Sequence, residues 1–587
     1  MRKTYYNIIG AVCIVCGMSS CADFLEIKPQ NEIILEDFWG EKADVENIVA
    51  GCYAALQSSD VIKRMIVWGE VRSDNIQAGS NINSDSHLYD VLKETLTAMN
   101  SYTKWDAFYT VINRCNTVIK YAPGVAAIDP SFTDGDLKAT IAEVSALRDL
   151  CYFYLIRTFR DVPYSEEAFT DDDQRMDLPA TPFETVLDHL IDDLEKVKGD
   201  AVNRYPEDKT GYQTGRITRD AIYAMLSEMY LWKKDYDNCI KYAELVIQSK
   251  KQYEEEQRNR NGRMIGSASN QATIEARLNG YPLVNDAIQG TMFGDAYEEI
   301  FVDGASKETI FELYFDRSPK NNNMPTNSAV SSFFGNATSK VGLLTAASAL
   351  DGDVKEPTGS GIFEKKDKDN YNDSRLFISY STNDEAIVKS VAQTIRIDAS
   401  KGKCTAGSAE RFASDNNGCN WIIYRLPDIM LLEAEALCQQ MEEGSDSAVI
   451  ARNKPKLDKA FSLVNAINKR AICKAILTEK DTLKASDYNT KRLMDELVQR
   501  ERRRELMFEG KRWYDLVRYS MRAGNTAPVI SAVTKRDDVN SAFAQNFFKK
   551  MDAIFWPYNN EEMKVNRNLV PNPVYGSGEN ESYEKTK

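Results

Sequence analysis

Helical periodicity is the feature that most constrains the fold of this 587-residue chain. Apolar residues recur at spacings of three and four, the period of an amphipathic helix, before about residue 250 and again beyond residue 420. Such helices bury their apolar stripes by packing on one another, so the pattern predicts an all-α fold. The segments are 41–57, 103–121, 137–160, 182–197, 217–232, 236–250, 424–440, 456–472 and 490–519.

Two of these segments, 217–232 and 236–250, have the spacing of a tetratricopeptide repeat. Small residues such as Ser227 and Ala243 stand where two helices would cross, and the aromatic Tyr230 would fill the groove between them. A second approximate unit runs from Leu432 to Ile467, with a longer insert expected between its helices. We expect these helix pairs to form a scaffold.

The middle of the chain reads differently. From about 251 to 420 it is rich in Asn, Gly, Ser, Asp and Lys, with short apolar runs such as 309–315. Long loops in a compact protein are usually functional or disordered, so we expect binding residues here and in the loop 68–102. The predicted single domain, 37–587, has a helical scaffold at about 37–250 and 421–520, this loop-rich insert, and an irregular C-terminal segment, 521–587.

The N-terminus predicts export and lipidation. Arg2 and Lys3 precede a short apolar run, and Ser19 and Ser20 place small residues before Cys21, as in a lipobox. The apolar run is roughly half the 20 residues that a membrane-spanning helix needs. We therefore expect a signal peptide at 1–20, lipidation of Cys21, and a polar tether at 21–36 that anchors the protein to a membrane. The alternative is an uncleaved N-terminus with a chance cysteine.

Charge and residue usage exclude several classes of protein. The formal net charge of −15 becomes −17 once Arg2 and Lys3 leave with the signal peptide, the wrong sign for a nucleic-acid binder. Two histidines in the whole chain argue against zinc sites and against Ser-His or Cys-His catalysis, and we expect no cofactor and no metal site; calcium is left open. Of the cysteines, only Cys404 and Cys419 lie in a segment where pairing is expected, and both outcomes stay open.

At this point the residues resemble the SusD/RagB family of outer-membrane nutrient-binding lipoproteins of the Bacteroidetes. The most specific block is 501–516, Glu-Arg-Arg-Arg-Glu-Leu-Met-Phe-Glu-Gly-Lys-Arg-Trp-Tyr-Asp-Leu. One departure is Arg160, where the family usually has Gly. Further similar segments, in family order, are 21–29, 143–148, 159–163, 215–218, 300–301, 308–312, 373–376, 424–436 and 572–575.

The resemblance implies a SusD-like all-α fold, with tetratricopeptide-like helix pairs on one side and a loop-rich face that captures glycans, or in some members peptides. It also implies a partner, a SusC-type TonB-dependent outer-membrane barrel over which the lipoprotein sits as a lid. The implied location is the outer membrane, surface-exposed and lipid-anchored.

The block 501–516 also invites a catalytic interpretation with Glu505 and Glu509 as paired carboxylates. Helical spacing, however, predicts pairs at i,i+3: Glu501 with Arg504, Arg502 with Glu505, and Glu509 with Arg512. Carboxylates held by guanidinium groups have lowered pKa values and are poor general acids. We therefore predict structural ion pairs.

Aromatic residues in polar segments are better candidates for ligand binding, because a sugar ring presents an apolar face edged by hydroxyl groups. The segment around Trp68 combines a flat ring with donors and acceptors, and further aromatics lie in the two expected loops. Trp105, Trp232, Trp421 and Trp513 lie in scaffold blocks and are expected in the core. The candidate binding residues are Trp68, Arg72, Asp74 and Asn75 first, then Tyr102, Phe333 and Phe334.

These observations predict a binding protein without catalytic activity, which captures oligosaccharides and passes them to the transporter. Alternatives are the same role for peptides, a lipid-anchored glycoside hydrolase, which needs two opposed carboxylates about 5–9.5 Å apart, and a tetratricopeptide scaffold that binds other proteins.

Overall fold

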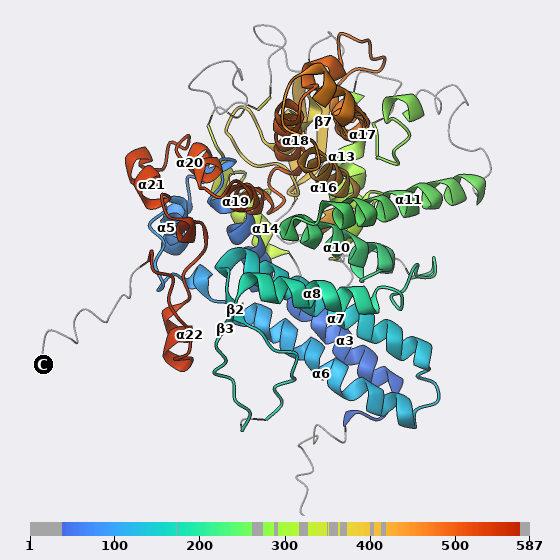
Figure 1. The fold of residues 1–587 in the computed structure, drawn as a ribbon, viewed down its shortest axis with the longest axis vertical. Coiled ribbons are helices and arrows are strands. Elements are labelled where there is room, and N and C mark those ends of the chain that lie inside the picture. Colours follow the sequence, from blue (N-terminus) through green and yellow to red (C-terminus); the bar gives the residue numbers. More distant parts are fainter. Residues whose placement is uncertain are drawn as a thin grey trace, which may run out of the picture.

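The computed structural model (Figure 1) describes residues 38–575, except 172, 210, 261–273, 287–291, 316–326, 349, 351–361, 364–372, 400–403 and 413–417. The predicted signal peptide, Cys21 and the tether lie outside these residues. The described chain is mostly helical with a few short strands, which confirms the predicted all-α class. None of its described helices is both long enough and apolar enough to cross a bilayer.

The first part of the chain forms a stack of helices. Each of α3, α6, α7, α8, α10 and α11 packs on the next, so the apolar stripes face one another (Figure 1). The helices are α3 (Lys42–Leu56), α4 (Ser59–Ile66), η2 (Val67–Val71), η3 (Ile82–Ser84), α5 (Ser86–Leu92), η4 (Ser101–Thr103), α6 (Asp106–Ile128), α7 (Asp134–Phe159), α8 (Phe183–Val197), α9 (Tyr212–Gly215), α10 (Arg219–Lys233) and α11 (Tyr236–Arg260).

The ends of α7 follow from its sequence. The Thr133 hydroxyl accepts a hydrogen bond from the backbone N–H of Asp136, and the Asp136 carboxylate accepts one from the backbone N–H of Thr133, which forms a capping box. The helix stops at Arg160, whose φ of 72° lies in the left-handed region. Only glycine adopts this region without strain, so this position has the backbone that the family's usual glycine would suit.

The predicted tetratricopeptide-like hairpin is α10 and α11. Lys234 closes its turn in the left-handed conformation, and the Ser227 hydroxyl donates to the carbonyl oxygen of Cys239 at 3.0 Å where the helices cross. In the second helix pair, α16 and α17, the second helix begins earlier than predicted. Asp446 caps α17 at Ser447 rather than near 456, so the turn before it is short and the expected longer insert is absent from this pair.

The second half of the scaffold packs on α11 through α16. A separate apolar cluster fills the space between α11, α16, α17 and α18. The helices of this part are α16 (Leu426–Gln439), α17 (Ser447–Ala471), η6 (Ala485–Tyr488), α18 (Lys491–Leu506) and α19 (Arg512–Ala523).

The loop-rich middle contains short elements that tie distant parts of the chain together. Strand β1 pairs with β6 and β5 with β9, all antiparallel, while β7 pairs with both β4 and β8. The elements are β1 (Ile76–Ala78), β4 (Met292–Phe293), α13 (Asp295–Tyr297), η5 (Glu298–Asp303), β5 (Thr309–Leu313), α14 (Ser328–Phe334), β6 (Leu344–Ala346), α15 (Ser374–Ser379), β7 (Ala392–Asp398), β8 (Thr405–Arg411) and β9 (Trp421–Arg425). Strands β2 (Val162–Pro163) and β3 (Ala180–Thr181) pair within the first half.

The C-terminal segment, which we expected to be irregular, contains short helices joined by turns. They are α20 (Ala527–Val533), α21 (Ser541–Phe547), η7 (Met551–Ile554) and α22 (Asn560–Val565). Asn560 donates its backbone N–H to the carbonyl oxygen of Ala98 at 2.8 Å, which brings α22 beside the loop that precedes α6.

The predicted structural role of the charged block is supported by a buried ion-pair network around Glu505. Arg425 Nη1 lies 2.6 Å from Glu505 Oε1, and Arg375 Nη1 lies 3.3 Å from Oε2. Arg470, near the end of α17, pairs with the same carboxylate. Burial alone would raise the pKa of Glu505, but Arg470, Arg425 and Arg375 lower it well below its usual value. The three arginines therefore favour the ionised form of Glu505.

Glu509 is held in the same way, and its partners again come from distant segments. Arg425 Nη2 and Lys389 Nζ lie 2.7 Å and 2.6 Å from Glu509 Oε1. Despite burial, which would raise it, these two cations lower the pKa of Glu509.

Most of the ion-pair partners that we predicted within the block 501–516 were wrong. Only Glu501 and Arg504 pair at i,i+3, at 3.7 Å. Arg502 contacts Asp428 at 2.6 Å and Asp515 at 2.8 Å, and Arg512 contacts Asp74 at 2.9 Å. Helical spacing finds only neighbours on one helix. The predicted helix 490–519 is instead two helices, because α18 ends at Leu506 and α19 begins at Arg512, and the buried charges of this block face other elements.

The described cysteines form no disulfide bonds with one another, and this includes Cys404 and Cys419, whose pairing the sequence left open. Cys404 Sγ lies 3.8 Å from the carbonyl oxygen of Cys473, and Cys419 Sγ lies 3.7 Å from Asn327 Nδ2. These two thiols therefore have different neighbours.

The network predicts that Glu505→Gln lowers the stability of the fold. Neutralising the carboxylate leaves several buried guanidinium groups without a counter-charge, which typically costs about 3–5 kcal/mol. The melting temperature measured by calorimetry should therefore fall. The control is Glu496→Gln on the same helix, where the side chain is 57% exposed and pairs only with Arg492. An unchanged melting temperature for Glu505→Gln would contradict a structural role.

Candidate functional site

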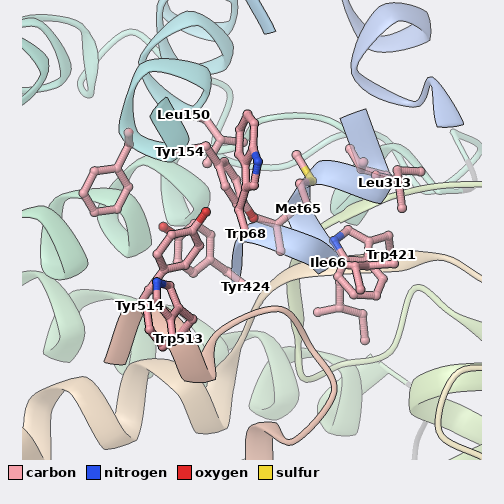
Figure 2. Packing of buried hydrophobic residues seen from close by; sticks show 14 of the residues in the cluster. Met65, Ile66, Trp68, Leu150, Tyr154, Leu313, Trp421, Tyr424, Trp513 and Tyr514 are labelled. Atoms are coloured by element: carbon pink, nitrogen blue, oxygen red, sulfur yellow. The ribbon is translucent and has the colours of Figure 1, made fainter. Parts of the chain in front are cut away.

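The first predicted binding residue, Trp68, lies in the core. We expected a loop, but Val67–Val71 is a helical turn that continues α4, and Trp68 is 0% exposed. Its ring stacks on Phe108 with centroids 4.9 Å apart, and its Nε1 donates to the carbonyl oxygen of Tyr102 at 2.8 Å. Figure 2 shows Trp68 among the buried hydrophobic residues. Our expectation that Trp68 is not a core residue was wrong, because the polar residues that follow it are themselves buried.

Those polar residues are occupied by partners within the protein. Arg72 pairs with Glu94 at 2.8 Å, and its guanidinium lies 4.5 Å from the centre of the Trp513 ring. Asn75 donates to Glu70 at 2.9 Å and accepts a hydrogen bond from Arg503 at 2.8 Å. These side chains thus have the hydrogen-bond donors and acceptors that we expected, but the donors and acceptors bind other groups of the protein and stabilise its fold.

The Asp74 carboxylate is also paired with other side chains of the protein. Its carboxylate lies 3.0 Å from Arg503 and 2.9 Å from Arg512. These two cations lower its pKa despite burial, which acts in the opposite direction. Asp74 is 3% exposed, so it presents no carboxylate edge to solvent.

The remaining candidates are also packed beneath the surface. Tyr102 and Phe333 come together, with ring centroids 6.5 Å apart, and the Tyr102 hydroxyl donates to Asp85 at 2.6 Å. Phe334 packs against Phe508 at 6.3 Å. Phe333 and Phe334 are 0% exposed and Tyr102 is 7% exposed, so none of the three has an open ring face for a sugar. The neighbouring segment 316–326 is outside the described residues.

A cavity of about 510 Å³ lies on another part of the molecule, between α6, the loop 163–178 and α22. This volume is within the range of small-molecule sites, about 300–1,000 Å³. Its lining residues are Trp105, Asp106, Tyr109, Thr110, Ile112, Asn113, Asn116, Tyr152, Pro163, Ser165, Phe169, Met176, Asp177, Leu178, Glu562, Val565, Asn566 and Leu569.

Aromatic side chains from the start of α6 form one wall of this cavity. Trp105 precedes the helix and packs against Phe159 and Tyr558, with centroids 5.1 and 5.2 Å away. Tyr109 lies one turn further, 5.7 Å from Trp105, and its hydroxyl donates to the carbonyl oxygen of Pro163 at 2.6 Å. Because both rings are held by core contacts, this wall is preorganised.

The loop 163–178 forms the opposite wall and is fixed by amide side chains of α6. Asn113 accepts from the backbone N–H of Phe169 at 2.8 Å and donates to its carbonyl oxygen at 2.9 Å. One turn further along α6, Asn116 donates to the carbonyl oxygens of Ser165 and Glu167 at 3.2 and 3.0 Å. These bonds hold the Phe169 ring beside the cavity.

The segment after α22 closes the third side. Asn566 donates to the carbonyl oxygen of Leu178 at 2.7 Å. Met176 and Val565, which are 56% and 78% exposed, give the rim an apolar character. The cavity is therefore lined in part by apolar side chains, two of which are exposed to solvent.

Three carboxylates, those of Asp106, Asp177 and Glu562, are among the polar groups that line the cavity. Burial raises the pKa of Glu562, a hydrogen bond from Trp105 lowers it and the nearby Asp106 raises it, with a net rise. Hydrogen bonding from Arg175 lowers the pKa of Asp177, whose carboxylate also accepts from Asn568 at 3.2 Å. Flat rings beside carboxylate acceptors suit a ligand with apolar faces and hydroxyl edges.

Sequence reasoning assigned Trp105 to the core, which burial confirms, but it missed this cavity. The sequence did contain a pattern that could have indicated the cavity. Asp106, Tyr109, Thr110 and Asn113 recur at helical spacing on α6, where they interrupt the apolar pattern with aromatic and hydrogen-bonding groups. Within the described parts of the chain, no three His, Cys, Asp or Glu side chains are grouped so that they could hold a metal ion.

Comparison with known families gives two matches that together span most of the chain. Residues 245–575 match the profile described as "SusD family", and residues 23–231 match the one described as "Starch-binding associating with outer membrane". Among curated proteins, SusD-like protein P38 of Formosa agariphila is 24% identical over 550 residues, covering 88% of this chain and 92% of that protein.

Solved structures share the fold. A SusD superfamily protein from Bacteroides thetaiotaomicron has a TM-score of 0.59 at 20% identity, covering 92% of this chain and 99% of the other. A second, from Bacteroides vulgatus, has a TM-score of 0.60 at 17% identity, with coverage of 92% and 100%. A structure described as a laminarin binding SusD-like protein has a TM-score of 0.56 at 18% identity, with coverage of 91% and 99%.

The position of Trp68 predicts that Trp68→Ala destabilises the protein. Removing a fully buried tryptophan typically costs about 3–5 kcal/mol, so the midpoint of urea unfolding should fall well below that of the wild type. Phe543→Ala is the matched control, since that ring is 43% exposed and its loss should change the midpoint little. A Trp68→Ala protein of normal stability would contradict the core assignment.

Proposed function

Because the chain belongs to the SusD family, we propose that it is a cell-surface lipoprotein that binds oligosaccharides and passes them to a SusC-type TonB-dependent outer-membrane transporter. The family description, starch binding in association with the outer membrane, supports the ligand class and the location. The similarity to the structure described as a laminarin binding SusD-like protein supports the ligand class. The lipobox at Cys21 supports anchoring by a lipid.

The proposed binding site rests on one observation, the cavity between α6, the loop 163–178 and α22. It places the rings of Tyr109 and Phe169 beside the carboxylates of Asp106 and Glu562. A pyranose ring could stack its apolar face on such a ring and donate its hydroxyl protons to the carboxylates. We therefore assign oligosaccharide binding to this cavity.

Glycoside hydrolysis is the second candidate, because the cavity contains several acids and the pKa of Glu562 is raised, as a general acid requires. The other acids are less suited to catalysis. Hydrogen bonding from Arg175 lowers the pKa of Asp177, and Asp106, 69% exposed, lies 3.6 Å from Arg64. We therefore favour binding without catalysis, and a binding assay that also measures released sugar separates the two.

A blocking variant tests the site. Thr110 is an exposed residue of α6 at the cavity, and its hydroxyl donates to the backbone carbonyl oxygen of Asp106, in the same helix, at 3.0 Å. Thr110→Arg should leave the fold intact, fill the cavity and weaken binding of starch or laminarin oligosaccharides at least roughly tenfold. Calorimetric titration with purified oligosaccharides measures the change.

The matched control is Ala127→Arg, the same side chain at an exposed position on the same helix but outside the cavity. It should bind like the wild type. Tyr89→Ala, in α5 of the segment 68–102, tests the location that we first expected. If Tyr89→Ala abolishes binding while Thr110→Arg does not, the site lies in that segment. Retention of peptides in place of oligosaccharides would identify the alternative cargo.

Anchoring is tested separately by Cys21→Ala. Because lipidation of Cys21 supplies the proposed membrane attachment, the variant should appear in the soluble fraction after cell disruption, while the wild type sediments with membranes. A Cys21→Ala protein that stays in the membrane pellet would rule out the lipid anchor.

A further inference from the structure

Two buried thiols from distant parts of the chain lie in contact with each other. Cys404 directly precedes β8 and Cys473 follows α17, and the two are 69 positions apart in sequence. Cys404 Sγ lies 3.8 Å from the carbonyl oxygen of Cys473, and the two side chains are close enough to share a hydrogen bond. Neither lines the proposed oligosaccharide site, so that site does not account for their proximity.

The chain around each of these cysteines is held in place by other interactions. Next to Cys473, Arg277 donates to the carbonyl oxygens of Ile472 and Lys474 at 2.5 and 2.7 Å. On the other side of the contact, Thr405 is the first residue of β8 and pairs with β7. Because both backbones are fixed, the two side chains stay adjacent in the folded protein.

The other cysteines of the described chain offer no comparable pair. The partner that the sequence suggested for Cys404 has a different neighbour, since Cys419 Sγ lies 3.7 Å from Asn327 Nδ2. Three further thiols lie near one another on α3, α6 and α7, so the structure singles out no pair among them. They are Cys52, Cys115 and Cys151.

We infer that Cys404 and Cys473 form a disulfide bond that ties the start of β8 to the end of α17. The inference rests on the proposed export, since disulfides form and persist outside the cytoplasm. The structure describes the two thiols before oxidation. One cysteine thiolate attacks the disulfide of a donor, such as a thiol–disulfide oxidoreductase, and the second then displaces the donor sulfur from the mixed disulfide. The cysteines lose two electrons and two protons, and the donor disulfide gains both as it is reduced to two thiols.

The oxidation takes place while the chain folds, before the sulfurs are buried. In the folded protein the hydrogen bond with Cys404, together with burial, raises the pKa of the Cys473 thiol well above its usual value. A protonated thiol is a poor nucleophile, so the folded and reduced protein should react slowly with a donor disulfide. The bond, once formed, is buried in the same way, and a reductant should open it only after the protein is denatured.

Peptide mapping tests the pairing directly, because trypsin places each cysteine in a short peptide of its own. Cleavage after Lys and Arg releases Cys404 within residues 404–411 and Cys473 within residues 471–474. The protein is extracted from membranes and denatured, its free thiols are blocked with N-ethylmaleimide without any reductant, and it is digested. We expect one cross-linked species that contains both peptides and that separates into them on reduction.

Melting temperatures show what the bond does. The wild type refolded with a reductant should melt several degrees below the oxidised form, because the bond closes a long loop in the unfolded chain. In Cys404→Ala the two preparations should melt alike. Cys438→Ala is the matched control, since that thiol is also buried, within α16, and this variant should keep the difference between the oxidised and reduced forms.

Separate, blocked peptides 404–411 and 471–474 would overturn the inference, as would a link from either one to residues 412–425, which contain Cys419. Refolding of the purified protein with reduced and oxidised glutathione then identifies the cause. If the bond forms there but not in the protein from membranes, the proposed export is wrong, and if it forms in neither, the pairing is wrong. Equal melting temperatures of the oxidised and reduced wild type would contradict the stabilising role.

Discussion

Buried pairs of carboxylates and guanidinium groups around residues 501–512 are the interaction on which the rest of the fold depends. Glu505 and Glu509 bind Arg425 at the start of α16, and Glu505 also binds Arg375 of the loop-rich part and Arg470 of α17. An unpaired buried charge costs several kcal/mol. Each of these segments therefore needs the others in place.

The same block reaches the N-terminal half of the chain. Arg503 and Arg512 bind Asp74, and the backbone N–H of Phe508 donates to Glu70 at 3.2 Å. This explains why the polar segment after Trp68 is buried, and why it resembles a binding loop in sequence. Its donors and acceptors match those of α18 and α19 rather than those of a sugar. The N-terminal stack of helices is thus joined to α18 and α19.

Regular local patterns could be predicted from the sequence, and contacts between distant segments could not. The α10–α11 hairpin and most helices followed from apolar spacing, because that period is a property of one segment. The charges of 501–512 were recognised as structural, yet most of their partners were wrong, since Asp74 and Arg425 lie far away in sequence. The cavity combines residues near 106–116, 163–178 and 562–569, and no local pattern shows that these segments meet.

The most direct test of the central claim is peptide-resolved hydrogen exchange of Glu505→Gln against the wild type. If the buried charges hold distant segments together, amides should exchange faster in α18 and also in β9, α15 and the end of α17, which contact Glu505 only through side chains. Faster exchange confined to α18, with the other three segments unchanged, would contradict the account.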